Sequence, residues 1–136
     1  MKYNGIIQRK LAFLDMQLIR IQENLGNIGF DEFTNNWVLR SMAERALQVA
    51  VEIVIDVSER ILAIEGAGPA ASSTETIDKL VALKILDSTE PFKTMVRFRN
   101  LVVHHYEEID PVILYDIAKN KLADFRLFMK QISKNN

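Results

Sequence analysis

The sequence predicts an all-α protein, an antiparallel helical bundle of about five helices. Apolar residues recur at alternating steps of three and four along most of the 136 residues, the spacing of a helix face that packs on a core. Capping and proline signals separate these stretches, and few alternating β-branched runs exist to support a sheet. A chain of this length, with a 49% hydrophobic share, is expected to form one domain over residues 1–136.

The first two predicted helices have the clearest apolar stripes. The first helix is expected to end near Gly26 or Gly29, because glycine ends helices readily. The second covers about residues 34–65, which is long for a globular helix, so a bend is expected. The first stripe is Ile7, Leu11, Leu14, Leu18, Ile21 and Leu25, and the second is Ala46, Val49, Ile53, Val57, Ile61 and Ile64. Both stripes are typical of bundle helices.

Capping signals place two further helices. Ser72 and Glu75 have the spacing of a capping box and open a third helix that runs to about Leu86. Asp110 followed by Pro111 gives a similar start signal for the last helix. The predicted buried stripe of the last helix is Leu114, Ala118, Leu122, Phe125, Met129 and Ile132.

The fourth helix, which lies between these two, departs from a simple bundle pattern. Asp87 or Ser88 is expected to cap it, with Pro91 in its first turn. Its apolar stripe is Phe92, Met95, Arg99, Val102 and Tyr106. An arginine therefore occupies a position that should face the core. Because a buried unpaired guanidinium is costly, Arg99 needs an acid, a carbonyl, an opening to water or a groove shared with a partner.

The opposing stripe of the fourth helix is Lys93, Arg97, Asn100 and His104. Asn100 and His104 are four residues apart, so the amide could orient the imidazole. Histidine moves protons near neutral pH, since its ordinary pKa is about 6.5, and arginine fits phosphate; together they indicate phosphodiester chemistry. At about 100° per residue, Arg99 and His104 point some 140° apart. Either the helix ends or distorts at the motif, or a second copy of the chain completes the site.

Composition limits the environment and the partners. Without cysteine, the chain has neither a disulfide framework nor a thiolate metal site. No signal peptide is visible at the start, and Glu52 and Asp56 break the most apolar run, so we expect a cytoplasmic protein with no membrane span. A net charge of −1 argues against a protein that coats nucleic acid nonspecifically. Any contact with nucleic acid must therefore be local.

The run Arg99-Asn100-x-x-x-His104-x-Tyr106 resembles the signature of HEPN-domain toxins of the HepT type. Its position near the end of the fourth helix of a small α-bundle fits that family. Three other segments support the resemblance: Glu44-Arg45-Ala46-Leu47-Gln48-Val49-Ala50, Phe98-Arg99-Asn100, and Ile109-Asp110 followed by Tyr115.

The resemblance implies a metal-independent endoribonuclease that cleaves mRNA or tRNA, acts as a homodimer and needs no cofactor. Such a protein is the toxin of a type VII-like toxin–antitoxin pair. The antitoxin of this family is a nucleotidyltransferase, MntA, and the resemblance implies that it transfers AMP to the motif tyrosine, here Tyr106. A transferred AMP would add bulk and negative charge beside the site, so RNA would be repelled.

The residue types agree with the roles that the resemblance implies. RNA can be cut without metal when a base takes the 2′-hydroxyl proton and an acid protonates the departing 5′-oxygen. His104 is the candidate for this proton transfer, and Arg99 would hold the phosphate and offset the growing charge. Asn100 would orient His104 or donate to a phosphate oxygen, and two copies of His104 could divide the base and acid roles. The possible RNA-phosphate contacts are Lys93, Arg97 and His105.

Two alternatives are weighed against this hypothesis. The first is a metal site, because His104 with Glu107 or Glu108, and His105 with Glu108, have helical ligand spacing. No other histidine exists to complete such a centre, so no metal is expected. The second is a non-catalytic HEPN-like helical module that binds a nucleotide or a nucleotidyltransferase partner. An assay for RNA cleavage without divalent metal would distinguish the two hypotheses, because only a nuclease would cut.

Overall fold

The structure is a computed structural model, and it describes Tyr3, residues 5–104 and residues 109–135, with the backbone alone for residues 101–104. The helices, in chain order, are α1 (Gly5–Leu25), α2 (Phe30–Thr34), α3 (Trp37–Ile64), α4 (Ser73–Ala82), α5 (Phe92–His104), α6 (Pro111–Asn120) and α7 (Leu122–Lys134). These described residues include no strand, so the predicted all-α class is confirmed. The number of helices is seven in this part of the chain, where about five were expected.

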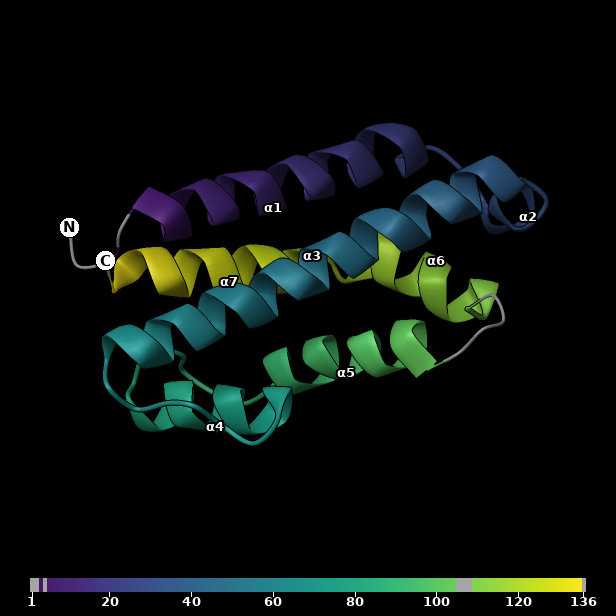
Figure 1. The fold of residues 1–136 in the computed structure, drawn as a ribbon. Coiled ribbons are helices and arrows are strands. Elements are labelled where there is room, and N and C mark those ends of the chain that lie inside the picture. Colours follow the sequence, from purple (N-terminus) through teal and green to yellow (C-terminus); the bar gives the residue numbers. More distant parts are fainter. Residues whose placement is uncertain (1–2, 4, 105–108, 136) are drawn as a thin grey trace.

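The long helices form an antiparallel bundle around α3 (Figure 1). Helix α3 crosses the middle of the molecule, and α1 and α5 run beside it in the opposite direction. Helices α6 and α7 follow one another behind α3, while α4 lies beside α5 at the far end of α3. Among the described residues, none of the helices combines the length and the apolar character that crossing a membrane requires.

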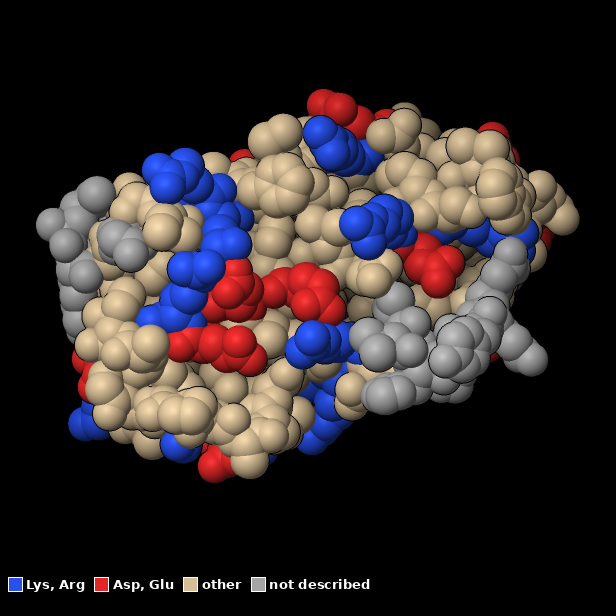
Figure 2. Space-filling model, in the orientation of Figure 1, with Lys and Arg blue, Asp and Glu red and all other residues tan. Residues whose placement is uncertain are grey.

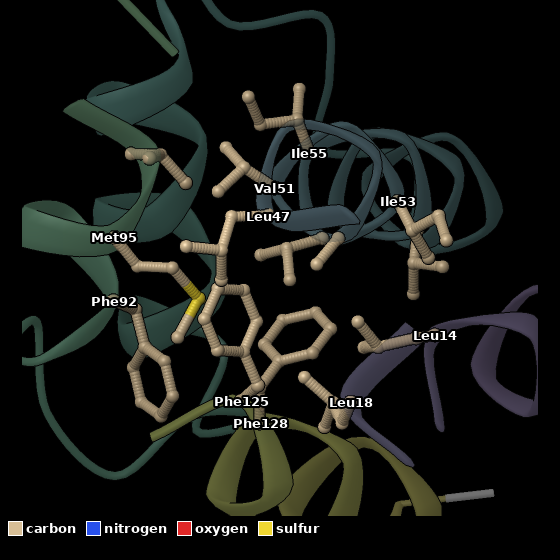
Figure 3. Close-up of a cluster of buried hydrophobic side chains, with 14 of the residues drawn as sticks. Leu14, Leu18, Leu47, Val51, Ile53, Ile55, Phe92, Met95, Phe125 and Phe128 are labelled. Carbon is tan, nitrogen blue, oxygen red and sulfur yellow. The ribbon is translucent and has the colours of Figure 1, made fainter. Parts of the chain in front are cut away.

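The buried side chains meet between α1, α3, α5 and α7. Every residue of the stripe predicted for the first helix is buried in α1. Figure 3 shows Phe125 and Phe128 of α7 pointing between Leu18 of α1 and Phe92 of α5, with α3 side chains above them. Phe92 and Phe128 meet edge to face, with ring centroids 6.0 Å apart. The bundle is therefore held by one continuous apolar core.

Helix α3 is buried on more than one side. Its buried residues are Ala43, Ala46, Leu47, Ala50, Val51, Ile53, Val54, Ile55, Val57, Ser58, Ile61 and Leu62. Ala46, Ile53, Val57 and Ile61 of the predicted stripe belong to this set. Val49 and Ile64 do not, since Val49 is half-buried and Ile64 is 44% exposed. A helix packed on several sides has few positions left for polar residues.

Two helix ends are set by residues in the left-handed backbone region. Gly66, with φ of 68°, ends α3, and the amide of Ala67 donates to the carbonyl of Leu62. Lys84, with φ of 63°, ends α4 in the same way, because the amide of Ile85 donates to the carbonyl of Leu80. The prediction that this helix runs to Leu86 is therefore wrong, and α4 ends at Ala82.

Capping explains where α4 and α5 begin. The Ser72 hydroxyl accepts from the amide of Glu75, as the capping-box spacing predicts. For α5 the predicted caps are wrong: neither Asp87 nor Ser88 accepts from an amide of its first turn in the described hydrogen bonds. The Glu90 carboxylate does so instead, accepting from the backbone amide of Thr94 at 3.1 Å and from its hydroxyl at 2.6 Å.

The last predicted helix is two helices. The carboxylate of Asp110 accepts from the amide of Val112, so the predicted start is confirmed. The helix is interrupted at Lys121, which lies between the end of α6 and the start of α7. Helix α2 was not predicted. The ring of Phe33, in α2, packs against Tyr115 of α6. The Tyr115 hydroxyl donates to the carbonyl of Ile28 at 2.6 Å. Tyr115 therefore fastens α6 to the turn that follows α1.

The stability of the bundle should depend on the buried face of α1 far more than on its outer face. Leu18 is fully buried, whereas the adjacent Ile19 is 40% exposed. We expect Leu18→Ala to lower the free energy of unfolding by about 2–5 kcal/mol, because it leaves a cavity. Ile19→Ala should change it by no more than about 0.5 kcal/mol. Urea unfolding followed by circular dichroism measures both, and similar losses in the two variants would contradict this packing.

Candidate functional site

Helix α5 carries the arginine of the predicted motif and is fixed by its apolar side. Phe92, Met95, Val96 and Phe98 are all buried, and they dock α5 on α3 and α4. Arg99 follows Phe98 directly and therefore lies where this buried side meets the surface. Its side chain is 42% exposed, so it stands at the rim of the core and not inside it.

Arg99 has an acidic partner on α3. Its Nε atom lies 3.0 Å from Oε1 of Glu52, whose side chain is 41% exposed. An acid was one of the four environments that the sequence required for this arginine. A guanidinium has five N–H donors and a carboxylate can take two of them, so at least three remain for another anion. Exposed pairs of this kind contribute about 0.2–1 kcal/mol, so a phosphate can compete with Glu52.

The ion pair lies in a pocket of about 500 Å³ between α1, α3 and α5. The residues around it are Lys10, Arg45, Gln48, Val49, Glu52, Ile53, Ile55, Asp56, Glu59 and Arg99. Figure 2 shows carboxylates in the middle of this face, with basic side chains on either side of them. We call this pocket, with its surrounding residues, the α3 pocket.

The carboxylate of Asp56 is the most strongly held acid of the α3 pocket. It forms ion pairs with Lys10 of α1 and with Arg60 one turn further along α3. Burial raises the pKa of the Asp56 carboxyl, but the hydrogen bonds and charges of Lys10 and Arg60 outweigh burial and leave that pKa below its ordinary value. Asp56 is therefore ionised at neutral pH and neutralises Lys10.

The other predicted site residues lie on α5 or directly follow it in the sequence. Asn100 is exposed on α5, next to Arg99. Position 104 is the last residue of α5, but the side chain of His104 lies outside the described residues, as do His105 and Tyr106 entirely.

The predicted phosphate contacts Lys93 and Arg97 both form ion pairs near the start of α5. Lys93 lies 2.8 Å from Asp78 of α4, and Arg97 lies 3.5 Å from Glu90. A hydrogen bond from the Thr94 hydroxyl, opposed by slight burial, leaves the pKa of Glu90 below its ordinary value, so this acid is ionised beside Arg97. Neither basic residue lines the α3 pocket.

Sequence analysis missed the α3 side of the site. Arg45, Gln48 and Glu52 line the α3 pocket. In the sequence, Arg45 and Gln48 served only as part of a segment that supports the family resemblance, and Glu52 only as a charge that breaks an apolar run. The available signal was their spacing of three and four residues on an otherwise apolar helix. Within the described residues, no group of three histidine, cysteine, aspartate or glutamate side chains could hold a metal ion.

Comparison with known proteins places this arrangement in a family. The family model described as Ribonuclease HepT-like matches residues 14–132. The tRNA nuclease HepT of Aphanizomenon flos-aquae is 25% identical over 130 residues, which cover 94% of this chain and 88% of that protein. The mRNA nuclease HepT of Shewanella oneidensis is 28% identical over 131 residues, covering 95% of this chain and 97% of that protein.

Solved structures agree with these matches. The tri-AMPylated HEPN toxin of Shewanella oneidensis, in complex with its MNT antitoxin, has a TM-score of 0.87 and 27% identity, covering 97% of this chain and 99% of that one. A toxin–antitoxin structure with AMP-PNP gives a TM-score of 0.87 at 26% identity, covering 96% and 99% of the two chains. YutE of Bacillus subtilis, at 18% identity and a TM-score of 0.82 over 96% and 88%, shares the fold. The resemblance carried by the segment from Arg99 to Tyr106 is thus confirmed, and this chain belongs to the Ribonuclease HepT-like family.

Proposed function

We propose that this protein is the ribonuclease toxin of a type VII-like toxin–antitoxin pair and that it cleaves mRNA or tRNA without a metal ion. The observation that carries the proposal is Arg99, a half-exposed guanidinium beside a pocket, on the helix that ends at His104. Relatives named as a tRNA nuclease and an mRNA nuclease support it. Its RNA substrate is made and used in the cytoplasm, where we place the activity.

The proposed cleavage uses the 2′-hydroxyl of the RNA as nucleophile. One copy of His104 takes the 2′-hydroxyl proton, and the 2′-oxygen forms a bond to phosphorus. The bond from phosphorus to the 5′-oxygen breaks, and a protonated His104 supplies the proton that this oxygen needs. Arg99 binds the phosphate and stabilises the charge that grows on it, while Asn100 orients His104 or donates to a phosphate oxygen.

The regular geometry of α5 favours a site shared by two copies of the chain. Helix α5 continues through position 104, so on an ideal helix positions 99 and 104 point about 140° apart. One copy therefore cannot readily direct both side chains at one phosphate. In a homodimer, Arg99 of one copy and His104 of the other can face the same phosphate, and the two histidines can divide the acid and base roles.

The proposed antitoxin is an MntA-type nucleotidyltransferase that transfers AMP from ATP to Tyr106. The phenolic oxygen would attack the α-phosphorus of ATP, and pyrophosphate would leave. The relative from Shewanella oneidensis is described as tri-AMPylated and in complex with an MNT antitoxin, which supports this partner. Because Tyr106 is two residues from His104, the negative charge of the added phosphate would repel RNA from the site. Regulation and cleavage would then act at the same place.

Cleavage of RNA in EDTA tests the nuclease proposal. We expect the purified protein to cut mRNA or tRNA without divalent metal. His104→Ala should slow cleavage by about 10²- to 10⁴-fold because proton transfer is lost, and Arg99→Ala by about 10²- to 10³-fold because phosphate stabilisation is lost. Lys130→Ala, which removes an exposed charge on α7, is the matched control and should cut at the wild-type rate. Intact RNA after incubation with wild type would favour the non-catalytic helical module.

The modification site can be tested by mass spectrometry. After incubation with the nucleotidyltransferase and ATP, peptides that contain Tyr106 should gain the mass of one adenylyl group, which is AMP less one water, and RNA cleavage should stop. Tyr106→Phe should keep its ability to cut RNA but resist inhibition, because it lacks the oxygen that forms the bond. Transfer of AMP to Tyr115 or another residue would refute the assignment.

Assembly provides a separate test of the shared site. Sedimentation at micromolar concentration should show a dimer. Mixing Arg99→Ala with His104→Ala should restore part of the cleavage and not all of it, because the mixed dimer keeps one Arg99 and one His104, from opposite copies, at the same phosphate and lacks the second histidine. A protein that sediments only as a monomer, or a mixture without any recovery, would contradict a site shared between copies.

A further inference from the structure

We infer that the α3 pocket is a binding subsite for the RNA strand beside the scissile bond, and that Arg45 binds a flanking phosphate there. The inference rests on the proposed function, because it takes Arg99 as the residue at the scissile phosphate. It adds a residue of α3 to a site that was otherwise confined to α5 and the segment after it.

Arg45 is the basic residue of the α3 pocket that has no acidic partner among the described residues. Lys10 is paired with Asp56, and Arg99 is paired with Glu52. Arg45 is exposed and lines the same pocket, yet it takes part in none of the described ion pairs or hydrogen bonds. A phosphate that approaches Arg45 displaces no carboxylate of the described residues, so the charge of this guanidinium is not shared with any of them.

The register of α3 and α5 places Arg45 at the end of the pocket that lies beside position 104 of α5. The two helices run in opposite directions, and the ion pair between Glu52 and Arg99 places those positions level with each other (Figure 1). Arg45 precedes Glu52 by seven residues, or about 10 Å along α3. Position 104 follows Arg99 by five residues, or about 7.5 Å in the same direction. Arg45 therefore lies beside the end of α5 that carries His104, within reach of a neighbouring phosphate.

The charges of the pocket also give the strand a direction. Beyond Glu52, towards the carboxyl end of α3, Lys10 is already paired with Asp56, and the carboxylate of Glu59, which takes part in none of the described ion pairs, repels phosphate. In the other direction it presents Gln48 and then Arg45. The Gln48 amide is half-buried, and it offers donors and an acceptor to a ribose or a base. RNA that is bound at Arg99 should therefore extend towards the amino end of α3.

The salt dependence of RNA binding tests this subsite. The probe is a short single-stranded RNA of mixed sequence with every 2′-hydroxyl methylated, which cannot be cut by the proposed reaction. Each phosphate contact in single-stranded nucleic acid contributes about 0.7 to the slope of log affinity against log salt. We expect Arg45→Ala to reduce this slope by about 0.7 and to weaken binding about tenfold, while Arg45→Lys keeps the slope.

Arg60→Ala is the matched control, because it removes the same charge from the same helix about 22 Å away. Arg60 is already paired with Asp56, so its loss should leave the slope unchanged. Circular dichroism confirms that each variant is folded. An unchanged slope in Arg45→Ala, or an equal reduction in Arg60→Ala, overturns the subsite. Because binding is measured without cleavage, this failure is distinct from a wild-type protein that does not cut RNA in EDTA.

Discussion

The packing of α3 is the constraint on which the rest of the structure depends. Helix α3 contacts each of the other six helices that the structure describes, and it contributes buried residues on several sides. Charged side chains stay on such a helix only where no neighbour covers them fully. On α3 this uncovered strip runs through Arg45, Gln48, Glu52, Asp56 and Glu59 between α1 and α5. The pocket beside Arg99 is therefore a consequence of how the bundle covers its central helix.

The start of α5 is held by more contacts than the part of the helix around Arg99. At the start, the Glu90 carboxylate caps the first turn, and the ion pair of Lys93 with Asp78 ties the helix to α4. Towards the other end, Arg99 is held by a single exposed pair with Glu52, whose loss costs little. A firmly anchored helix start and a weakly held arginine suit the role proposed for Arg99, in which the guanidinium would exchange Glu52 for phosphate.

Local signals in the sequence predicted most of the helices but not the contacts between them. The α1 stripe, the Ser72 cap and the Asp110 cap could be predicted because each involves residues within a few positions of one another. The break at Lys121 could not, because Ala118, Leu122 and Phe125 keep helical spacing across it. Helix α2 is too short to show a period, and Lys84 takes a backbone conformation in which glycine is the expected residue.

The same limit applies to the site. The sequence indicated that Arg99 needed compensation, since charge on an apolar stripe is a local contradiction. That Glu52 supplies it depends on the register between α3 and α5, which periodicity along one helix does not contain. The predicted contacts Lys93 and Arg97 share a helix face with position 104, but carboxylates of α4 and of the turn before α5 hold them. Which basic side chains have no acidic partner therefore depends more on the neighbouring helices and turns than on the position of the residue along its own helix.

A protein with a net charge of −1 cannot hold RNA by long-range attraction, so each phosphate must be bound by particular residues. At Arg99 the phosphate would replace Glu52, and the gain would be the difference between two similar interactions. At Arg45 no described carboxylate has to leave, so the contact adds its full effect. In the proposed site, affinity would come mainly from Arg45, whereas Arg99 would be reserved for the charge that develops during cleavage. Binding and catalysis would then depend on different arginines, one on each side of the same pocket.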